Sequence, residues 1–258
     1  MSCSNCGRPI CPECMTPTPV GMRCPECARQ KTRVTRGAAG AGRSDAPATY
    51  VLIALNVAAY LVEIVSGAGG LDPSRSTVVV DFGLFGPFVA DGEWYRVLTY
   101  GFLHSGLIHI GFNMFALYFL GRVLEPGIGT PRFVAVYLAS VLGGAFGALL
   151  LSPDTLTVGA SGGVFGIFAA TFVIARERGI DALASNIALI LLLNLAISVV
   201  APRISLGGHL GGLAAGALCS LVVVAGERGM LGRNRLPVEI AAMALVALGS
   251  VAGALAVA

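Results

Sequence analysis

Residues 206–225 read LGGHLGGLAAGALCSLVVVA, and this stretch decides the class of fold. It holds 20 residues with no Asp, Glu, Lys or Arg among them. An α-helix of that length covers about 30 Å, which is the thickness of the hydrocarbon core of a bilayer. The stretch therefore predicts a membrane-spanning helix that carries one imidazole, His209, near its beginning.

Six further apolar segments of similar length occur along the chain, at 48–66, 101–121, 133–151, 158–175, 183–201 and 238–257. The whole sequence is 55% hydrophobic and 12% charged, whereas soluble domains carry about 25% charged residues. These numbers exclude an ordinary soluble enzyme and give no reason to expect a nucleic acid partner. They predict an all-α polytopic membrane protein with seven spans in a lipid bilayer.

The basic residues predict the orientation of these spans. If the N-terminus is cytoplasmic, 14 of the 17 Lys and Arg residues lie on the cytoplasmic side, which leaves Arg75, Arg96 and Arg203 outside. The positive-inside rule favours this arrangement, with the C-terminus outside. The loop after the first span contains the stretch 82–90, which is too apolar for a solvated loop and too short to span. We expect an interfacial or half-inserted loop, with an ordinary outer loop as the alternative.

The N-terminal segment predicts a metal-binding module. Three CxxC pairs lie within residues 3–27, namely Cys3 with Cys6, Cys11 with Cys14 and Cys24 with Cys27. Each pair can supply two thiolates to a tetrahedral ion, and structural Zn²⁺ is the usual occupant in a reducing compartment. The first and third pairs can form one four-thiolate site and leave the second pair as a half-site, although other pairings remain open. The segment resembles a B-box-type or zinc-ribbon module, which serves either to dock a cytoplasmic protein partner or as a structural knob.

These patterns divide the chain into four parts. Residues 1–30 form the zinc-binding module, and 31–47 form a flexible linker. Residues 48–225 form a membrane domain of six helices, and 226–258 form a cytoplasmic loop and an extra C-terminal helix.

Three polar side chains fall at a similar depth when the predicted topology is applied. His109, Ser161 and His209 all lie in the outer part of spans that run inward. Ionisable groups are costly inside a membrane and mark functional sites there. Ser161 alone also suits a helix cap or a packing position, and His209 alone a hydrogen-bonded helix histidine. Together, a hydroxyl and an imidazole indicate a nucleophile and its base.

Small residues favour close contact between the two spans that carry Ser161 and His209. The glycines concerned are Gly162 and Gly166 in one span and Gly208, Gly212 and Gly216 in the other. Such faces let two helix backbones approach closely.

His109 and Asn113 are four residues apart, so they share one helix face and can donate hydrogen bonds to an oxyanion. A polar pair that joins two helices is the alternative. Glu63 is the only acidic residue well inside a span, which predicts a Ser–His dyad without a carboxylate. Phe165 follows Ser161 by one turn and packs either against the His209 ring or in the core.

The sequence resembles the rhomboid protease family over about residues 48–225. The matching motifs are Trp94 and Arg96, His109-Ile-Gly-Phe-Asn113, Gly121-Arg-Val-Leu-Glu125-Pro-Gly-Ile-Gly129, Gly159-Ala-Ser161-Gly162 and Gly208-His209-Leu-Gly-Gly212-Leu-Ala-Ala-Gly216. The Cys-rich segment is not part of the family pattern. Phe165 stands where some members carry tyrosine, and His104 occupies a position that is often polar.

The resemblance implies a six-helix core plus one C-terminal helix, in an intramembrane serine endopeptidase that cleaves single-span membrane proteins. Ser161 would be the nucleophile, His209 the base, and His109 and Asn113 the oxyanion donors. Supporting roles would fall to Trp94, Arg96, Gly159, Gly162, Gly212, Glu125 and Phe165. Catalysis would need no cofactor. A bacterial plasma membrane suits the chain. The alternatives are a catalytically inactive rhomboid-like binder of membrane proteins and a small membrane transporter.

Overall fold

The structure is a computed structural model that describes residues 2–18, 21–29, 46–67, 76–201, 204–232 and 234–258. The chain divides into two compact units, Met1–Arg43 and Ser44–Ala258. Most of the linker expected at 31–47 lies outside the described residues, as do Arg75 and Arg203.

Among its described residues, the small unit has almost no apolar core. It contains a 3₁₀ turn (η1, Pro12–Cys14), a hairpin of β1 (Thr16–Thr18) and β2 (Gly21–Arg23), and the short helix α1 (Pro25–Arg29). The strands pair antiparallel, with Thr16 opposite Arg23. Its buried cluster consists of Ile10 and three cysteines. A unit this small buries too little apolar surface to be stable without a metal or another crosslink.

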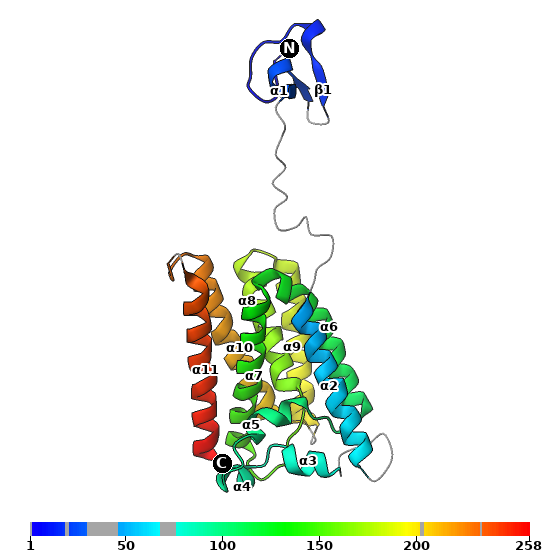
Figure 1. The fold of residues 1–258 in the computed structure, drawn as a ribbon, viewed down its shortest axis with the longest axis vertical. Helices are drawn as coiled ribbons and strands as arrows, with labels where there is room; N and C mark the ends of the chain where they lie inside the picture. Colours follow the sequence, from blue (N-terminus) through cyan, green and yellow to red (C-terminus); the bar gives the residue numbers. More distant parts are fainter. Residues whose placement is uncertain (1, 19–20, 30–45, 68–75, 202–203, 233) are drawn as a thin grey trace. The chain divides into compact units, whose positions relative to one another are not determined.

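The large unit is a bundle of long helices (Figure 1). Seven helices of 17 or more residues occur in the described chain: α2 (Pro47–Ser66), α6 (Leu107–Ile128), α7 (Thr130–Leu151), α8 (Ser161–Glu177), α9 (Asp181–Val200), α10 (Leu206–Glu227) and α11 (Arg235–Val257). Among the described residues between α2 and α6 there are four short helices: α3 (Thr77–Phe82), α4 (Gly86–Ala90), α5 (Arg96–Thr99) and η3 (Tyr100–Phe102). The stretch 82–90 is thus folded rather than extended.

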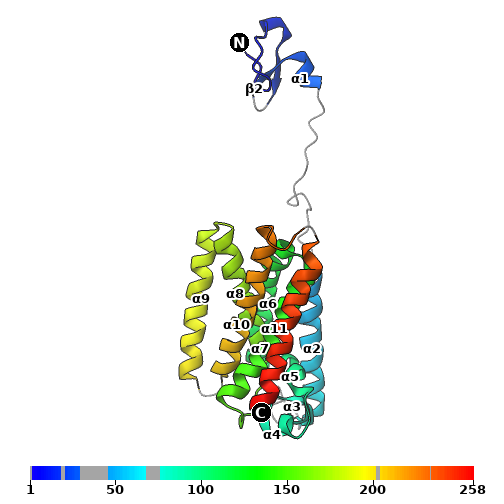
Figure 2. The same ribbon diagram turned by 90° about the vertical axis from the view of Figure 1, so that its left-hand side faces the viewer.

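Six of the long helices are apolar and long enough to cross a membrane, namely α2, α6, α7, α9, α10 and α11. The seventh, α8, has 17 residues, of which twelve are buried. It lies inside the bundle, in contact with α6, α7, α9 and α10 (Figures 1 and 2). The sequence predicted this span to begin at residue 158, but the helix begins at Ser161.

The second predicted span was placed six residues too early. It was expected at 101–121, whereas α6 is Leu107–Ile128. The apolar run from residue 101 belongs instead to η3 and to a loop that contains His104. His104 therefore lies just before the helix, and His109 lies in its first turn.

Glycines bring α7, α8 and α10 into backbone contact. A Cβ on Gly212 would lie 2.7 Å from the carbonyl carbon of Gly162, and one on Gly216 would overlap the backbone of Gly166. This confirms the close approach that the small residues of the two spans predicted. The glycines of α7 extend the same contact, since a Cβ on Gly143 would meet the carbonyl of Gly211. This third helix was not predicted from the sequence to take part in the contact.

Carboxylates fix two helix ends at the end of the bundle where α2 begins. Glu125, in the last turn of α6, accepts hydrogen bonds from the backbone N–H groups of Ala48 (3.0 Å) and Thr49 (2.8 Å). These N–H groups have no partner within α2, so Glu125 caps that helix. Glu239 of α11 is buried and forms an ion pair with Arg132 of α7.

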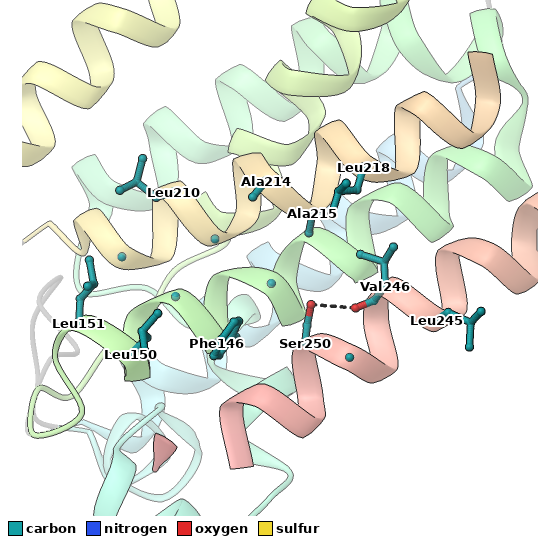
Figure 3. A pocket seen from close by; sticks show the side chains of 15 residues that line it. Phe146, Leu150, Leu151, Leu210, Ala214, Ala215, Leu218, Leu245, Val246 and Ser250 are labelled. Atoms are coloured by element: carbon teal, nitrogen blue, oxygen red, sulfur yellow. Dashed lines mark hydrogen bonds between the residues drawn. The ribbon is translucent and has the colours of Figure 1, made fainter. Parts of the chain in front are cut away.

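α11 also borders an apolar groove of about 530 Å³ between α7, α10 and α11 (Figure 3). Phe146, Leu218 and Val246 are among its lining residues. The groove contains neither Ser161 nor any of the three histidines.

Candidate active site and cysteine cluster

Ser161 is the first residue of α8, and main-chain hydrogen bonds hold the loop that leads to it. Thr157 and Leu84 exchange two such bonds, of 2.8 and 3.0 Å. The N–H of Gly159 donates to the carbonyl of Tyr100 at 3.0 Å. The segment between α2 and α6 thus fixes where the backbone of Ser161 lies.

Arg96 holds that segment together from inside. Its guanidinium is buried and donates to the carbonyl oxygens of Val80 (2.7 Å) and Gly83 (2.8 Å) and to the carboxylate of Glu93 (2.6 Å). It also lies over the ring of Phe88, 4.6 Å from the centroid. Trp94, which the family resemblance paired with Arg96, is 65% exposed and lies outside this network.

Gly159 lies between two of the expected functional side chains. Its φ of +138° is a conformation that other residues rarely adopt. A Cβ there would lie 2.8 Å from Nε2 of His109 and 3.6 Å from Oγ of Ser161. The serine hydroxyl and the His109 ring therefore face the same point, and only glycine leaves that point open.

His209 lies in the first turn of α10 and stacks on Phe165 of α8. The ring centroids are 3.9 Å apart and the planes are inclined by 15°. Phe165 is one helical turn after Ser161, so both lie on one face of α8. The stacking therefore brings the imidazole to the face of α8 that carries the serine. Of the two packing alternatives for Phe165, the structure has the one against His209.

The atoms that would react have no partner within the described chain. Neither Oγ of Ser161 nor Nε2 of His209 makes a hydrogen bond to a described residue. A catalytic hydrogen bond often forms only when a substrate is bound. Both atoms are thus available to each other or to a substrate.

The second nitrogen of His209 is held by a residue that sequence analysis missed. Its Nδ1 lies 2.7 Å from Oγ of Ser198 on α9, and both residues are buried. The sequence carries only a weak signal for it, namely that Asn194 and Ser198 are polar residues four apart in an apolar span. Ser198 thus gives the imidazole an uncharged hydrogen-bond partner.

His109 and Asn113 occupy one face of α6 near its beginning. The backbone N–H of Ser105 lies 3.4 Å from Nδ1 of His109, and its hydroxyl lies 3.1 Å away. A backbone N–H can only donate, so Nδ1 accepts and Nε2 of the neutral ring carries the proton toward Gly159. The amide of Asn113 donates to the carbonyl of His109 at 3.0 Å.

Two buried polar residues, His104 and Glu63, lie beside His109 or behind it. The ring of His104 lies 5.1 Å from that of His109, centroid to centroid. The backbone N–H of His104 donates to both carboxylate oxygens of Glu63, at 3.2 and 3.1 Å. Both residues are fully buried, and neither ring nitrogen of His104 has a partner within the described chain. Glu63 therefore anchors the loop before α6 rather than the dyad.

The small unit brings four of its six cysteines together. The sulfur atoms of Cys3, Cys6, Cys24 and Cys27 all lie within 4.8 Å of one another. Four thiolates around one Zn²⁺ at about 2.3 Å would be roughly 3.8 Å apart, so this set fits the ion. Cys11 and Cys14 are exposed and outside the cluster, with their sulfurs 2.6 Å apart.

The chain matches known proteins over the part that contains this site. The family model of the Rhomboid domain matches residues 91–226. Rhomboid protease GluP of Bacillus subtilis (strain 168) is 31% identical over 204 residues, which cover 78% of this chain and 38% of that protein. The putative rhomboid protease YdcA of the same organism is 34% identical over 53% of this chain and 70% of its own length.

Rhomboid-type serine protease 2 of Emericella nidulans is 33% identical over 52% of this chain and 28% of its own length. The chain spans less than two fifths of GluP and about seven tenths of YdcA. The matched region holds every residue of the proposed dyad and oxyanion pair. With its six apolar long helices and this match over more than half of its length, the chain is an integral membrane protein that belongs to the rhomboid family.

Proposed function

We propose that this protein is an intramembrane serine endopeptidase that cleaves single-span membrane proteins, with Ser161 as nucleophile and His209 as general base. The observation that carries the proposal is the stacking of the His209 ring on Phe165, one turn after Ser161 on the same helix face. The names of the relatives, rhomboid protease and rhomboid-type serine protease, support the same chemistry.

In the proposed reaction, Nε2 of His209 takes the proton of Ser161 while Oγ attacks the scissile carbonyl carbon. The oxyanion accepts hydrogen bonds from Nε2–H of His109, from the amide of Asn113 and from the backbone N–H of Ser161. His209 then gives its proton to the leaving amine, and an acyl-enzyme remains. Water hydrolyses the ester and restores the serine.

The proposed topology has the N-terminus in the cytoplasm and the C-terminus outside, in a bacterial plasma membrane. The supporting observation is the distribution of arginines at the ends of the long helices. Those at the end of the bundle opposite the Ser161 site are Arg122, Arg132, Arg176, Arg178, Arg228 and Arg235. The positive-inside rule assigns this end to the cytoplasm, which leaves the site near the outer face.

For the domains we keep the division into a metal-binding module (1–30), a linker (31–47), a six-helix catalytic domain (48–225) and a C-terminal extension (226–258). The module binds one structural Zn²⁺ through Cys3, Cys6, Cys24 and Cys27 and docks a cytoplasmic protein. The close grouping of the four sulfurs supports the zinc part of this proposal. Metal analysis of the purified protein should give one zinc per chain, lost in Cys3→Ser and retained in Cys11→Ser. Retention of zinc in Cys3→Ser would contradict this ligand set.

The test of the protease proposal compares the wild type with Ser161→Ala and His209→Ala on a model transmembrane substrate, and labels each with a fluorophosphonate. We expect cleavage to fall by at least about 1,000-fold in both variants, with no labelling of Ser161→Ala. Ser250→Ala is a matched control, because within the described chain this serine bonds only its own helix, at the carbonyl of Val246. Normal cleavage by Ser161→Ala would refute the proposal. A wild-type protein that is neither labelled nor able to cleave the substrate would favour the alternative, a catalytically inactive rhomboid-like binder of membrane proteins.

A further inference from the structure

The second half of α9 has one buried residue, and that residue contacts the imidazole. Along the helix only Ala184, Ile187 and Ser198 are buried, and Ser198 is 4% exposed. α9 lies at the edge of the bundle, chiefly against α8 (Figure 2). A serine buried on an otherwise lipid-exposed stretch of helix indicates a specific polar partner.

That partner is Nδ1 of His209, and the hydrogen atoms of the contact can be assigned. The hydroxyl of Ser198 lies 2.7 Å from the carbonyl oxygen of Asn194 and 2.7 Å from Nδ1 of His209. A carbonyl oxygen only accepts, so the single hydroxyl hydrogen points to Asn194. The hydroxyl oxygen then accepts from Nδ1–H, which leaves Nε2 of the neutral ring without a proton.

We propose that Ser198 is a positioning residue that holds His209 as its Nδ1–H tautomer, so that Nε2 is the base for Ser161. This inference rests on the proposed protease function. The ring is then held on two sides, by Phe165 on its face and by Ser198 at its edge.

The contact gains strength as the reaction proceeds. When Nε2 takes the serine proton, the ring becomes an imidazolium whose Nδ1–H is a stronger donor. Ser198 accepts this bond and passes its polarisation to the carbonyl of Asn194. An uncharged oxygen performs this role without the cost of a carboxylate buried at membrane depth. Because the bond strengthens in the transition state, its loss lowers kcat more than it raises KM.

The kinetic test uses Ser198→Ala, which removes the acceptor, and Ser198→Thr, which keeps it. Ser185→Ala is the matched control, since it is an exposed serine on the same helix. We expect kcat for the model transmembrane substrate to fall roughly 10- to 100-fold in Ser198→Ala, with KM within about twofold of the wild type. Ser198→Thr should recover most of the loss, and Ser185→Ala should match the wild type.

A spectroscopic test separates tautomer control from a packing effect. Nitrogen-15 NMR of histidine-labelled protein distinguishes a ring with Nδ1–H from one with Nε2–H, and His209→Ala assigns the signals. The wild type and Ser198→Thr should have the Nδ1–H pattern at His209. Ser198→Ala should lose that pattern while the signals of His104 and His109 stay unchanged.

Two outcomes would overturn the inference: an unchanged kcat in Ser198→Ala, or an Nδ1–H pattern that persists in this variant. Either result leaves the protease proposal intact, provided that Ser161→Ala is inactive. Activity in Ser161→Ala would instead refute the protease proposal, and the NMR comparison would still report whether Ser198 sets the tautomer. If Ser198→Ala does not fold, the NMR pattern of His209 in the wild type and in Ser198→Thr decides the inference. An Nε2–H pattern there would overturn it.

Discussion

Arg96 donates to three groups from two separate nitrogens of its planar guanidinium, a geometry that a lysine ammonium cannot reproduce. Its planar guanidinium reaches two carbonyl oxygens and one carboxylate from a buried position. Lysine has a single nitrogen and would leave some of these acceptors unpaired. We expect Arg96→Lys to lower the free energy of unfolding by about 1.5–3 kcal/mol, measured by thermal or denaturant unfolding in detergent. Arg176→Lys, in an exposed ion pair, should change it by less than about 0.5 kcal/mol. Equal effects in the two variants would contradict this role for Arg96.

Glu93 makes the same network sensitive to acid. Hydrogen bonds from Arg96 and from the hydroxyl of Tyr95 hold the pKa of Glu93 below its ordinary value of 4.5. A carboxyl with a lowered folded-state pKa contributes stability above its unfolded pKa and loses it as the pH falls through the folded pKa. The melting temperature of the wild type should therefore fall more steeply below about pH 4.5 than that of Glu93→Gln. Parallel curves for the two proteins would rule out this contribution.

The residues of the site differ in how easily they can be identified from the sequence alone. His109 and His209 stand out because an imidazole in an apolar span is unusual, and their common depth with Ser161 follows from the topology. Ser198 does not stand out, because serine in a helix commonly bonds the carbonyl four residues earlier, as this one does with Asn194. Its second partner depends on which face of α9 is turned toward α10, and the apolar sequence of that helix does not determine the face.

The contact between α8 and α10 sets the distance between Ser161 and His209. A Cβ at Gly212 would collide with the backbone of Gly162, the residue after Ser161. We expect Gly212→Ala to push these helices apart and to lower kcat for the model substrate by at least about 100-fold. Gly249→Ala on α11 is the matched control, since nothing lies within 4 Å of the added carbon. Gly249→Ala should leave kcat unchanged and slightly stabilise α11, because alanine favours a helix more than glycine does.

Retained activity in Gly212→Ala would show that the helices tolerate the wider spacing, and the close contact would then not position the dyad.

The lengths of the helices were predictable from hydropathy, but some of their beginnings were not. The run that starts at residue 101 is apolar enough for a span, yet the backbone turns through η3 before α6 begins. Hydropathy does not register that turn, which depends on main-chain bonds to distant segments such as that between Gly159 and Tyr100.

At the scale of the whole molecule, the two units have cores of different kinds. The small unit buries chiefly cysteines, whereas the large unit has an extensive apolar core. We expect a zinc chelator to unfold the small unit, detected as faster amide hydrogen exchange in its described residues 2–18 and 21–29. Exchange in residues 44–258 and fluorophosphonate labelling should stay the same. Unchanged exchange in the small unit after zinc is removed would show that it folds without the ion.

The glycine contacts also predict a pattern of mutational tolerance along α10. At Gly212 and Gly216 the backbone of α10 touches the backbone of α8, so any side chain there would collide with the neighbouring helix. No other residue can therefore replace glycine at these two positions. Leu210 and Leu218 point outward and are about half exposed, and many apolar residues could replace them. A saturation library scored for cleavage should therefore alternate between intolerant and permissive positions with the period of the helix.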